Sequence, residues 1–328
     1  MALAGSGTPV AAQEYARLGE LKTMSIEELA SVEVTTVSKR GETLSGAPAS
    51  IYVITNEDIV RSAAQSVPEV LRQAPNLVVQ RIDARQFSVS ARGFNGVETA
   101  NKMLALIDGR TIYSPLASGV FWELHQPLLE DIDQIEVVSG PGGTLYGPNA
   151  VNGVINIQTK SALDTVGGMA RGTIAANQHS AALRYGAVVN DGAIRLYGNY
   201  FSRAEQPSGP GGVVNDRFSG YQIGLRGDFG AEDSRVAISA DHFGTDVATA
   251  ANDGERGQNV VLRWNRRMSE TISFQLQAYY DNYRRTFTKV RDELETFDVE
   301  GQINLTLGHH EVVAGGGLRT TRDLFENR

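Results

Sequence analysis

The sequence contains no cysteine in 328 residues, which excludes a disulfide framework and any zinc site built on thiolates. No run of 18 or more apolar residues occurs, so the sequence predicts no membrane-spanning helix. The formal net charge of -8 disfavours nucleic acid as a partner, because nucleic-acid binders normally present a basic face. Hydrophobic residues still make up 41% of the chain, which indicates a folded protein rather than a disordered one.

Residues typical of catalysis or metal binding do not occur at useful spacing either. There is no nucleophile elbow and no HExxH motif, so we expect neither enzymatic activity nor a cofactor. The glycine-rich turn at 139–147 lacks the Lys-Ser/Thr pair of a phosphate loop. Asp131 and its acidic neighbours lack calcium-loop spacing, which favours a solvated acidic surface. His309 and His310 have no partners at ligand spacing, so no metal site is expected.

The first 40 residues are expected to lie outside any compact domain. Residues 1–31 form a leader without the basic start and apolar core of a secretory signal. Its Ala11-Ala12-Gln13 fits either the tail of a cleavage region or a plain disordered leader. Residues 32–40 are rich in β-branched side chains, which predicts an extended strand.

Residues 41–160 contain the helix starts, turns and short strands of a compact domain of mixed helices and strands. Helix starts are predicted at Thr55 and Ser66, and Pro75 is expected to end the second helix. Asp108-Gly109 is a strong signal for a hairpin turn between two short strands. Further strands are predicted at 135–138 and 154–157, on either side of the glycine-rich turn.

From about residue 165 the sequence alternates apolar and polar side chains. One strand face is expected to carry Ile272, Phe274, Leu276, Ala278 and Tyr280, and the opposite face Ser273, Gln275, Gln277, Tyr279 and Asp281. About nine such strands are predicted, most of them about 10 to 14 residues long, which suits tilted strands that cross a bilayer.

The connections between these strands alternate between short and long. Short turns are predicted near 190–192, 230–234, 269–270 and 308–310, and long polar loops at 204–216, 246–256 and 286–295. A soluble β-sandwich would explain the alternation within strands but not this order of connections. Tight turns on one side and longer loops on the other are typical of bacterial outer-membrane barrels.

Residues 135–160 (IEVVSGPGGTLYGPNAVNGVINIQTK) resemble the plug signature of TonB-dependent outer-membrane receptors. Further plug hallmarks precede it in the family's order: residues 51–59 (IYVITNEDI), 67–78 (VPEVLRQAPNLV), 90–95 (SARGFN) and 106–113 (LIDGRTIY). Residues 32–40 (VEVTTVSKR) resemble the energy-coupling box ahead of the plug. One departure is Ser139, where the family usually has arginine before Gly-Pro.

The resemblance implies an α+β plug domain at 41–160 followed by antiparallel transmembrane β-barrel strands at 165–328. Barrels of this family have 22 strands, the class with a plugged lumen. About nine strands could not close around the plug, so we expect the barrel to be incomplete in this chain. The implied location is the bacterial outer membrane, with the plug and N-terminus facing the periplasm and outer-membrane lipid outside the barrel.

The resemblance also implies TonB-dependent uptake of a scarce nutrient, most often a ferric siderophore or another iron chelate. Cobalamin and oligosaccharides are alternative cargoes, and a truncated, non-transporting binding or signalling module is an alternative role. Outside the family, a soluble β-rich enzyme or binding protein lacks any supporting motif. The implied partner is the TonB-type energiser of the inner membrane, which pairs with the coupling box as an added strand.

Particular residues follow from the motif matches. The coupling box is assigned to Val34, Thr35, Thr36 and Val37. A polar network between plug and barrel is assigned to Arg92 and Glu136, for which an ordinary ion pair or strand polar group is the alternative. The substrate-facing apex is assigned to Arg81, Asp83, Arg85 and Tyr113.

Overall fold

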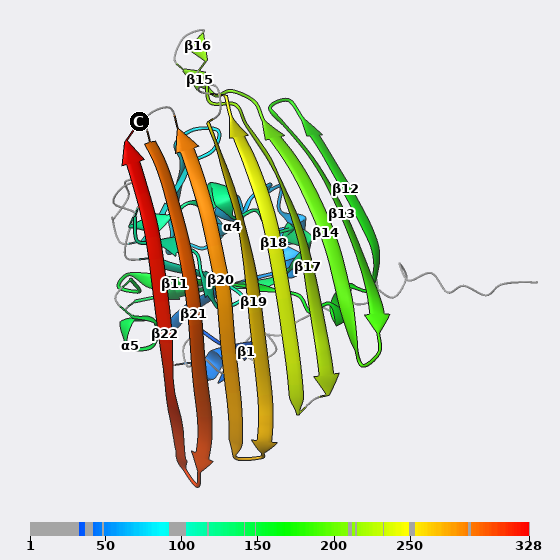
Figure 1. Cartoon of the computed structure of the whole chain (residues 1–328), viewed down its shortest axis with the longest axis vertical. Helices are drawn as coiled ribbons and strands as arrows, with labels where there is room; N and C mark the ends of the chain where they lie inside the picture. The colour runs from blue at the N-terminus through cyan, green and yellow to red at the C-terminus, as the bar shows by residue number, and fades with distance from the viewer. Residues whose placement is uncertain are drawn as a thin grey trace, which may run out of the picture.

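The structure is a computed structural model in which a small mixed domain lies against the concave face of a curved sheet (Figure 1). It describes residues 33–36, 42–47, 49–91, 103–116, 118–140, 142–147, 149–208, 212–213, 215–231, 233–248, 253–287 and 290–327. Within these ranges, no helix is long and apolar enough to cross a membrane.

The plug is built on a five-stranded sheet in the order β3-β10-β11-β6-β7. These strands are β3 (Ser50–Thr55), β6 (Met103–Ile107), β7 (Arg110–Thr111), β10 (Ile132–Ser139) and β11 (Gly153–Thr159). β11 pairs in parallel with β6, and the other neighbours are antiparallel. Both predicted strands beside the glycine-rich turn are confirmed. Ile135, Val137, Ile155 and Ile157 on them are fully buried.

Two short helices pack on this sheet, α3 (Asn56–Arg61) and α4 (Val67–Leu71). Thr55 caps α3 as predicted: its hydroxyl accepts from the N–H of Asp58, while the Asp58 carboxylate accepts from the N–H of Thr55. Helix α4 begins directly after Ser66, also as predicted, although no side-chain cap forms there. Ile59 and Leu71 bring the helices into the apolar core of the sheet.

Several short elements complete the plug and the chain segments directly before and after it. They are β1 (Glu33–Val34), β2 (Glu42–Thr43), η1 (Leu44–Gly46), β4 (Val78–Arg81), β5 (Phe87–Ser90), β8 (Tyr113–Ser114), β9 (Gly119–Val120), η2 (Trp122–Leu124), η3 (Leu129–Asp131), α5 (Gly143–Tyr146) and η4 (Leu163–Thr165). The predicted hairpin between β6 and β7 is confirmed. Asp108 and Gly109 adopt φ of 48° and 77°, the left-handed backbone that a two-residue hairpin turn requires.

The curved sheet, called the wall here, has nine antiparallel strands, in agreement with the predicted number. Its strands are β12 (Gly167–Ala175), β13 (Gln178–Val189), β14 (Gly192–Arg203), β17 (Phe218–Ala231), β18 (Ser234–Val247), β19 (Gly254–Ser269), β20 (Ile272–Phe287), β21 (Val290–Leu307) and β22 (His310–Asn327). The two-stranded hairpin of β15 (Pro207–Ser208) and β16 (Gly212–Val213) lies within the connection from β14 to β17.

One predicted loop is wrong. Residues 286–295 were expected to form a long polar connection, but β20 continues to Phe287 and β21 already begins at Val290. The polar side chains of this stretch pair across the two strands instead of facing water. Arg285 lies opposite Asp292, and the two form an ion pair of 3.1 Å. The long connections predicted near 204–216 and 246–256 are confirmed in position.

Replacement of Ile155 by alanine tests the importance of the plug's own core. Ile155 is fully buried on β11, so we expect Ile155→Ala to lower the free energy of unfolding by about 2–5 kcal/mol. Ile174→Ala is the matched control, because the Ile174 side chain on β12 is 92% exposed. Denaturant unfolding of the two variants in detergent measures the difference; equal losses would contradict a core centred on β11.

Candidate functional site

The Glu136 carboxylate on β10 holds the segment that was assigned as the coupling box. It is fully buried and accepts the backbone N–H groups of Thr35, at 3.1 Å, and Thr36, at 2.8 Å. Both threonine hydroxyls also donate to it. The side chains of Gln134, at 2.9 Å, and Gln158 supply further N–H donors. One buried anion therefore gathers donors from the N-terminal segment and from two strands of the plug.

Val34, Thr35 and Thr36, named here the coupling segment, have further contacts. Val34 is fully buried and lies in β1, which pairs with β2. The side-chain amides of Asn156 and Gln158 on β11 donate to the Thr35 hydroxyl, at 3.4 and 2.9 Å. Val37, the fourth residue assigned to the coupling box, lies outside the described residues.

The second assigned group was Arg92 with Glu136, as a polar tie between plug and barrel. Arg92 lies outside the described residues. As far as the structure is described, Glu136 bonds to the coupling segment and to plug neighbours rather than to the wall. Its role in a plug–barrel network stays a prediction, whereas its contact with Thr35 and Thr36 was not anticipated.

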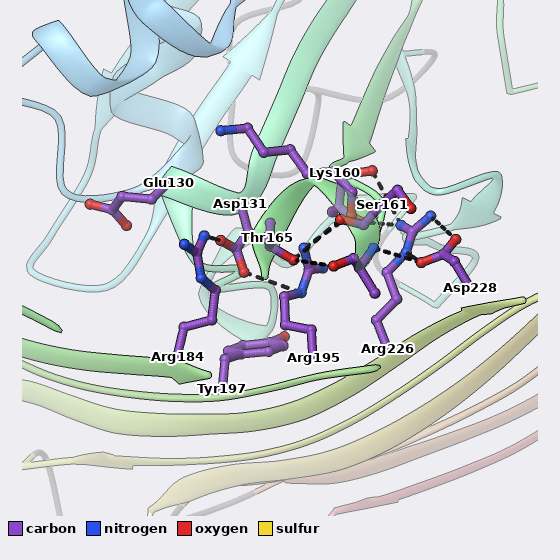
Figure 2. Close-up of polar contacts among 12 residues, drawn as sticks. Glu130, Asp131, Lys160, Ser161, Thr165, Arg184, Arg195, Tyr197, Arg226 and Asp228 are labelled. Carbon is purple, nitrogen blue, oxygen red and sulfur yellow. Dashed lines mark hydrogen bonds and ion pairs between the residues drawn. The ribbon is translucent and has the colours of Figure 1, made fainter. Parts of the chain in front are cut away.

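Plug and wall are joined instead by ion pairs that the sequence analysis missed. Asp131, expected on a solvated surface, is buried between Arg184 of β13 and Arg195 of β14, as Figure 2 shows. The pairs described between plug and wall are Glu130–Arg171 (2.5 Å), Asp131–Arg184 (2.5 Å), Asp131–Arg195 (3.3 Å), Asp108–Arg226 (3.5 Å), Arg110–Asp281 (2.5 Å), Arg85–Glu255 (3.0 Å) and Glu123–Arg285 (3.5 Å). The sequence signal that could have indicated these pairs is the presence of arginines at positions of the predicted strands that face inward.

The residues assigned to the substrate-facing apex are only partly brought together. Arg81, Asp83 and Arg85 share the β4–β5 hairpin, where the Asp83 carboxylate accepts the N–H groups of Arg85 and Gln86. Arg81 is paired with Glu69 at 2.7 Å. Tyr113 lies apart from them, on β8 of the plug, where it lines a cavity of about 220 Å³.

Arg85 belongs to a buried cluster of charges at the end of the wall that carries the long connections, called the loop end. It lies 3.1 Å from Glu123 of the plug and 3.0 Å from Glu255 of β19. Arg285 of β20 pairs with the same two carboxylates and with Asp292, and its guanidinium lies 3.5 Å from the centre of the Phe121 ring.

The cluster affects the titration of its plug carboxylate. Burial, and then the negative charge of Glu255, raises the pKa of Glu123 to about 7. The facing cations, Arg285 and Arg85, oppose this rise without cancelling it. Arg85, Glu123 and Arg285 also line a cleft of about 700 Å³ together with Phe287 and Phe325. Charged and aromatic side chains therefore meet at the loop end, but the arginines there already have carboxylate partners.

Residues 43–154 match the family described as TonB-dependent Receptor Plug Domain. The chain is a TonB-dependent receptor plug followed by part of a β-barrel. The family consists of bacterial outer-membrane receptors and transporters rather than enzymes, which confirms the expectation that the chain has no enzymatic activity. The predicted α+β plug followed by antiparallel strands is confirmed as well.

Relatives in sequence include a vitamin B12 transporter of Vibrio vulnificus, 37% identical over 136 residues, which are 41% of this chain and 21% of the relative. An iron-regulated outer membrane virulence protein of Vibrio cholerae is 35% identical over 132 residues, which are 39% of this chain and 20% of the relative. The matches thus span about a fifth of these curated relatives.

Solved structures agree in fold. The hemophore receptor HasR of Serratia marcescens matches with a TM-score of 0.68 and 16% identity, covering 86% of this chain and 46% of the receptor. The siderophore receptor PirA of Acinetobacter baumannii matches with a TM-score of 0.63 and 18% identity, covering 84% of this chain and 48% of the receptor. At such identities the likeness shows the fold alone.

The raised pKa of Glu123 predicts a pH-dependent stability. Between its ordinary pKa of 4.5 and about 7, the folded protein binds a proton that the unfolded chain releases. Stability should therefore fall by about 1–3 kcal/mol as pH rises through this window. Glu123→Gln imitates the protonated carboxyl and should flatten the dependence, whereas Glu57→Gln on the surface of α3 should not. Unfolding free energies from pH 5 to 8 test this, and an unchanged slope in Glu123→Gln would contradict it.

Proposed function

We propose that the receptor to which this chain belongs takes up a scarce nutrient across the bacterial outer membrane, driven by a TonB-type energiser. The observation that carries the proposal is the docking of the coupling segment on Glu136. A transporter of this kind needs a segment that is held by the plug and can be reached by an energiser.

The orientation of the chain supports this proposal. Thr35 lines a cavity together with Asn265 and Gln275, which flank the tight β19–β20 turn, so the coupling segment lies toward the short turns (Figure 1). Bacterial barrels keep their short turns on the periplasmic side. The coupling segment would then face the periplasm, where the energiser reaches it, and the loop-end cleft would face outward.

For the cargo, we propose an iron chelate, with Arg81, Asp83 and Arg85 on the apical hairpin and Tyr113 deeper in the plug. Arginines and aromatic rings suit an anionic, ring-containing chelate. Cobalamin is the second candidate. It is favoured by the likeness to a vitamin B12 transporter and by the ion pairs that already occupy Arg81 and Arg85.

Proline substitutions test the coupling box. Val34→Pro or Thr36→Pro in the intact receptor should abolish uptake and leave nutrient binding unchanged, because proline removes a backbone donor that strand addition needs. Thr36→Ala keeps that donor and should retain uptake. Cell uptake and equilibrium binding are measured for each variant; unimpaired uptake by both proline variants would rule out this segment as the coupling box.

Binding of ferric chelates and of cyanocobalamin to the purified receptor decides between the cargoes. If an iron chelate is the cargo, Arg81→Gln with Arg85→Gln should weaken its binding at least tenfold, since about 1.4 kcal/mol corresponds to one decade. Glutamine keeps an N–H donor for the facing carboxylates, and Arg61→Gln on α3 is the control. Binding of cyanocobalamin but of no ferric chelate would refute the iron proposal and support cobalamin.

A further inference from the structure

The backbone of the coupling segment is not extended where it meets Glu136. Successive N–H groups of a β-strand point in opposite directions. Here the N–H groups of Thr35 and Thr36 converge on one carboxylate, and the strand β1 ends at Val34. Two consecutive N–H groups directed at one anion form a concave anion-binding arrangement. The segment must therefore leave Glu136 before its backbone can pair along an added strand.

The partners of Glu136 make this contact detachable. Within the described ranges, its hydrogen-bond donors are backbone N–H groups, hydroxyls and glutamine amides, none of which is a cation. Hydrogen bonds to a charged group are stronger than neutral ones, so they favour the docked state. Among the described residues, release of the segment from Glu136 breaks hydrogen bonds to neutral donors, whereas the contacts between plug and wall include arginine ion pairs.

The same segment also bounds a polar cavity. Thr35 lines a space of about 560 Å³ between the plug and the inner face of β19, β20 and β21. Gln158 and the Asp108–Gly109 turn line it from the plug, and Arg263 and Gln277 line it from the wall. If the coupling segment leaves Glu136, this cavity loses the lining that Thr35 supplies at the end with the short turns.

We propose that Glu136 is a latch: it holds the N–H groups of Thr35 and Thr36 in a conformation that excludes strand pairing with the energiser, and release from Glu136 makes the segment available. This rests on the proposed function, in which the energiser binds the coupling segment as an added strand. Glu136 is thus a positioning residue that sets how often the coupling segment is accessible.

A cysteine reporter tests the latch directly, because the chain has no cysteine of its own. Val34→Cys places a thiol at a fully buried position of the coupling segment. In the intact receptor in detergent, adding Glu136→Ala should speed labelling of this thiol by a water-soluble maleimide at least tenfold. Glu136→Gln, which keeps one acceptor oxygen, should have an intermediate effect. Glu57→Ala, at an exposed ion pair on α3, should have none.

A second reporter distinguishes two roles of Glu136: holding the coupling segment, and stabilising the plug as a whole. Val70→Cys is fully buried in α4, which belongs to the plug core and lies away from the coupling segment. Its labelling should be unaffected by Glu136→Ala. If labelling at position 34 does not respond to Glu136→Ala, or if position 70 responds equally, the latch is overturned.

Binding of the energiser supplies an independent measurement. The probe is the soluble periplasmic domain of the TonB-type protein from the same organism. If only a minor released population binds, freeing the segment by Glu136→Ala should raise the apparent affinity at least fivefold. An unchanged affinity would overturn the proposed exclusion. Failure of the wild-type and variant receptors to bind the domain at all would instead refute the proposed coupling function, and the labelling experiment would still decide whether Glu136 holds the segment.

Discussion

A guanidinium on the inner face of a β-sheet is costly to bury unless an anion meets it, and the same holds for a carboxylate in a domain packed against that face. Arg195 of the wall and Asp131 of the plug are both buried, and each supplies the countercharge that the other requires. The same complementarity recurs, with the charges exchanged, at Arg85 of the plug and Glu255 of the wall. Matched charges therefore hold the plug against the wall, together with two small apolar clusters. In these clusters Ala84 of the plug packs with Phe201, Phe218 and Val247 of the wall, and Leu124 packs with Phe243, Tyr283 and Leu294.

The different contacts within the plug and between plug and wall affect how the plug can move against the wall. The plug has an apolar core of its own, centred on β10 and β11 and covered by α3 and α4, so its fold does not depend on the wall for hydrophobic burial. The interface contains polar cavities, such as the one lined by Asp108, Arg263 and Gln277. Water can solvate ionic groups as they separate, and the exposure of apolar surface would be penalised only at the two small clusters. A plug held in this way can shift against the wall and remain folded.

The sequence predicted those features whose signals are local. The Thr55 cap, the Asp108-Gly109 turn and the alternating strands depend on residues only a few positions apart, so short patterns were sufficient. It failed where polar residues pair over long distances. Residues 286–295 were taken for a loop because their polarity suggested solvent, but cross-strand partners satisfy it. Arg85 and Glu255 are 170 positions apart, and no local pattern indicates that they meet.

Three buried carboxylates lie close together along the chain, two of them paired with arginines and the third bonded to neutral donors. Glu123 meets arginines at the loop end, Asp131 meets arginines of β13 and β14, and Glu136 meets the neutral donors of the coupling segment. A single stretch, residues 123–136, thus joins the loop-end cleft to the coupling segment. A shift of this stretch would strain the arginine pairs, which need close approach of two charges, while the neutral donors at Glu136 could be exchanged for water at smaller cost. The contact with the coupling segment is therefore the first of the three expected to yield when the chain is pulled from its N-terminal side.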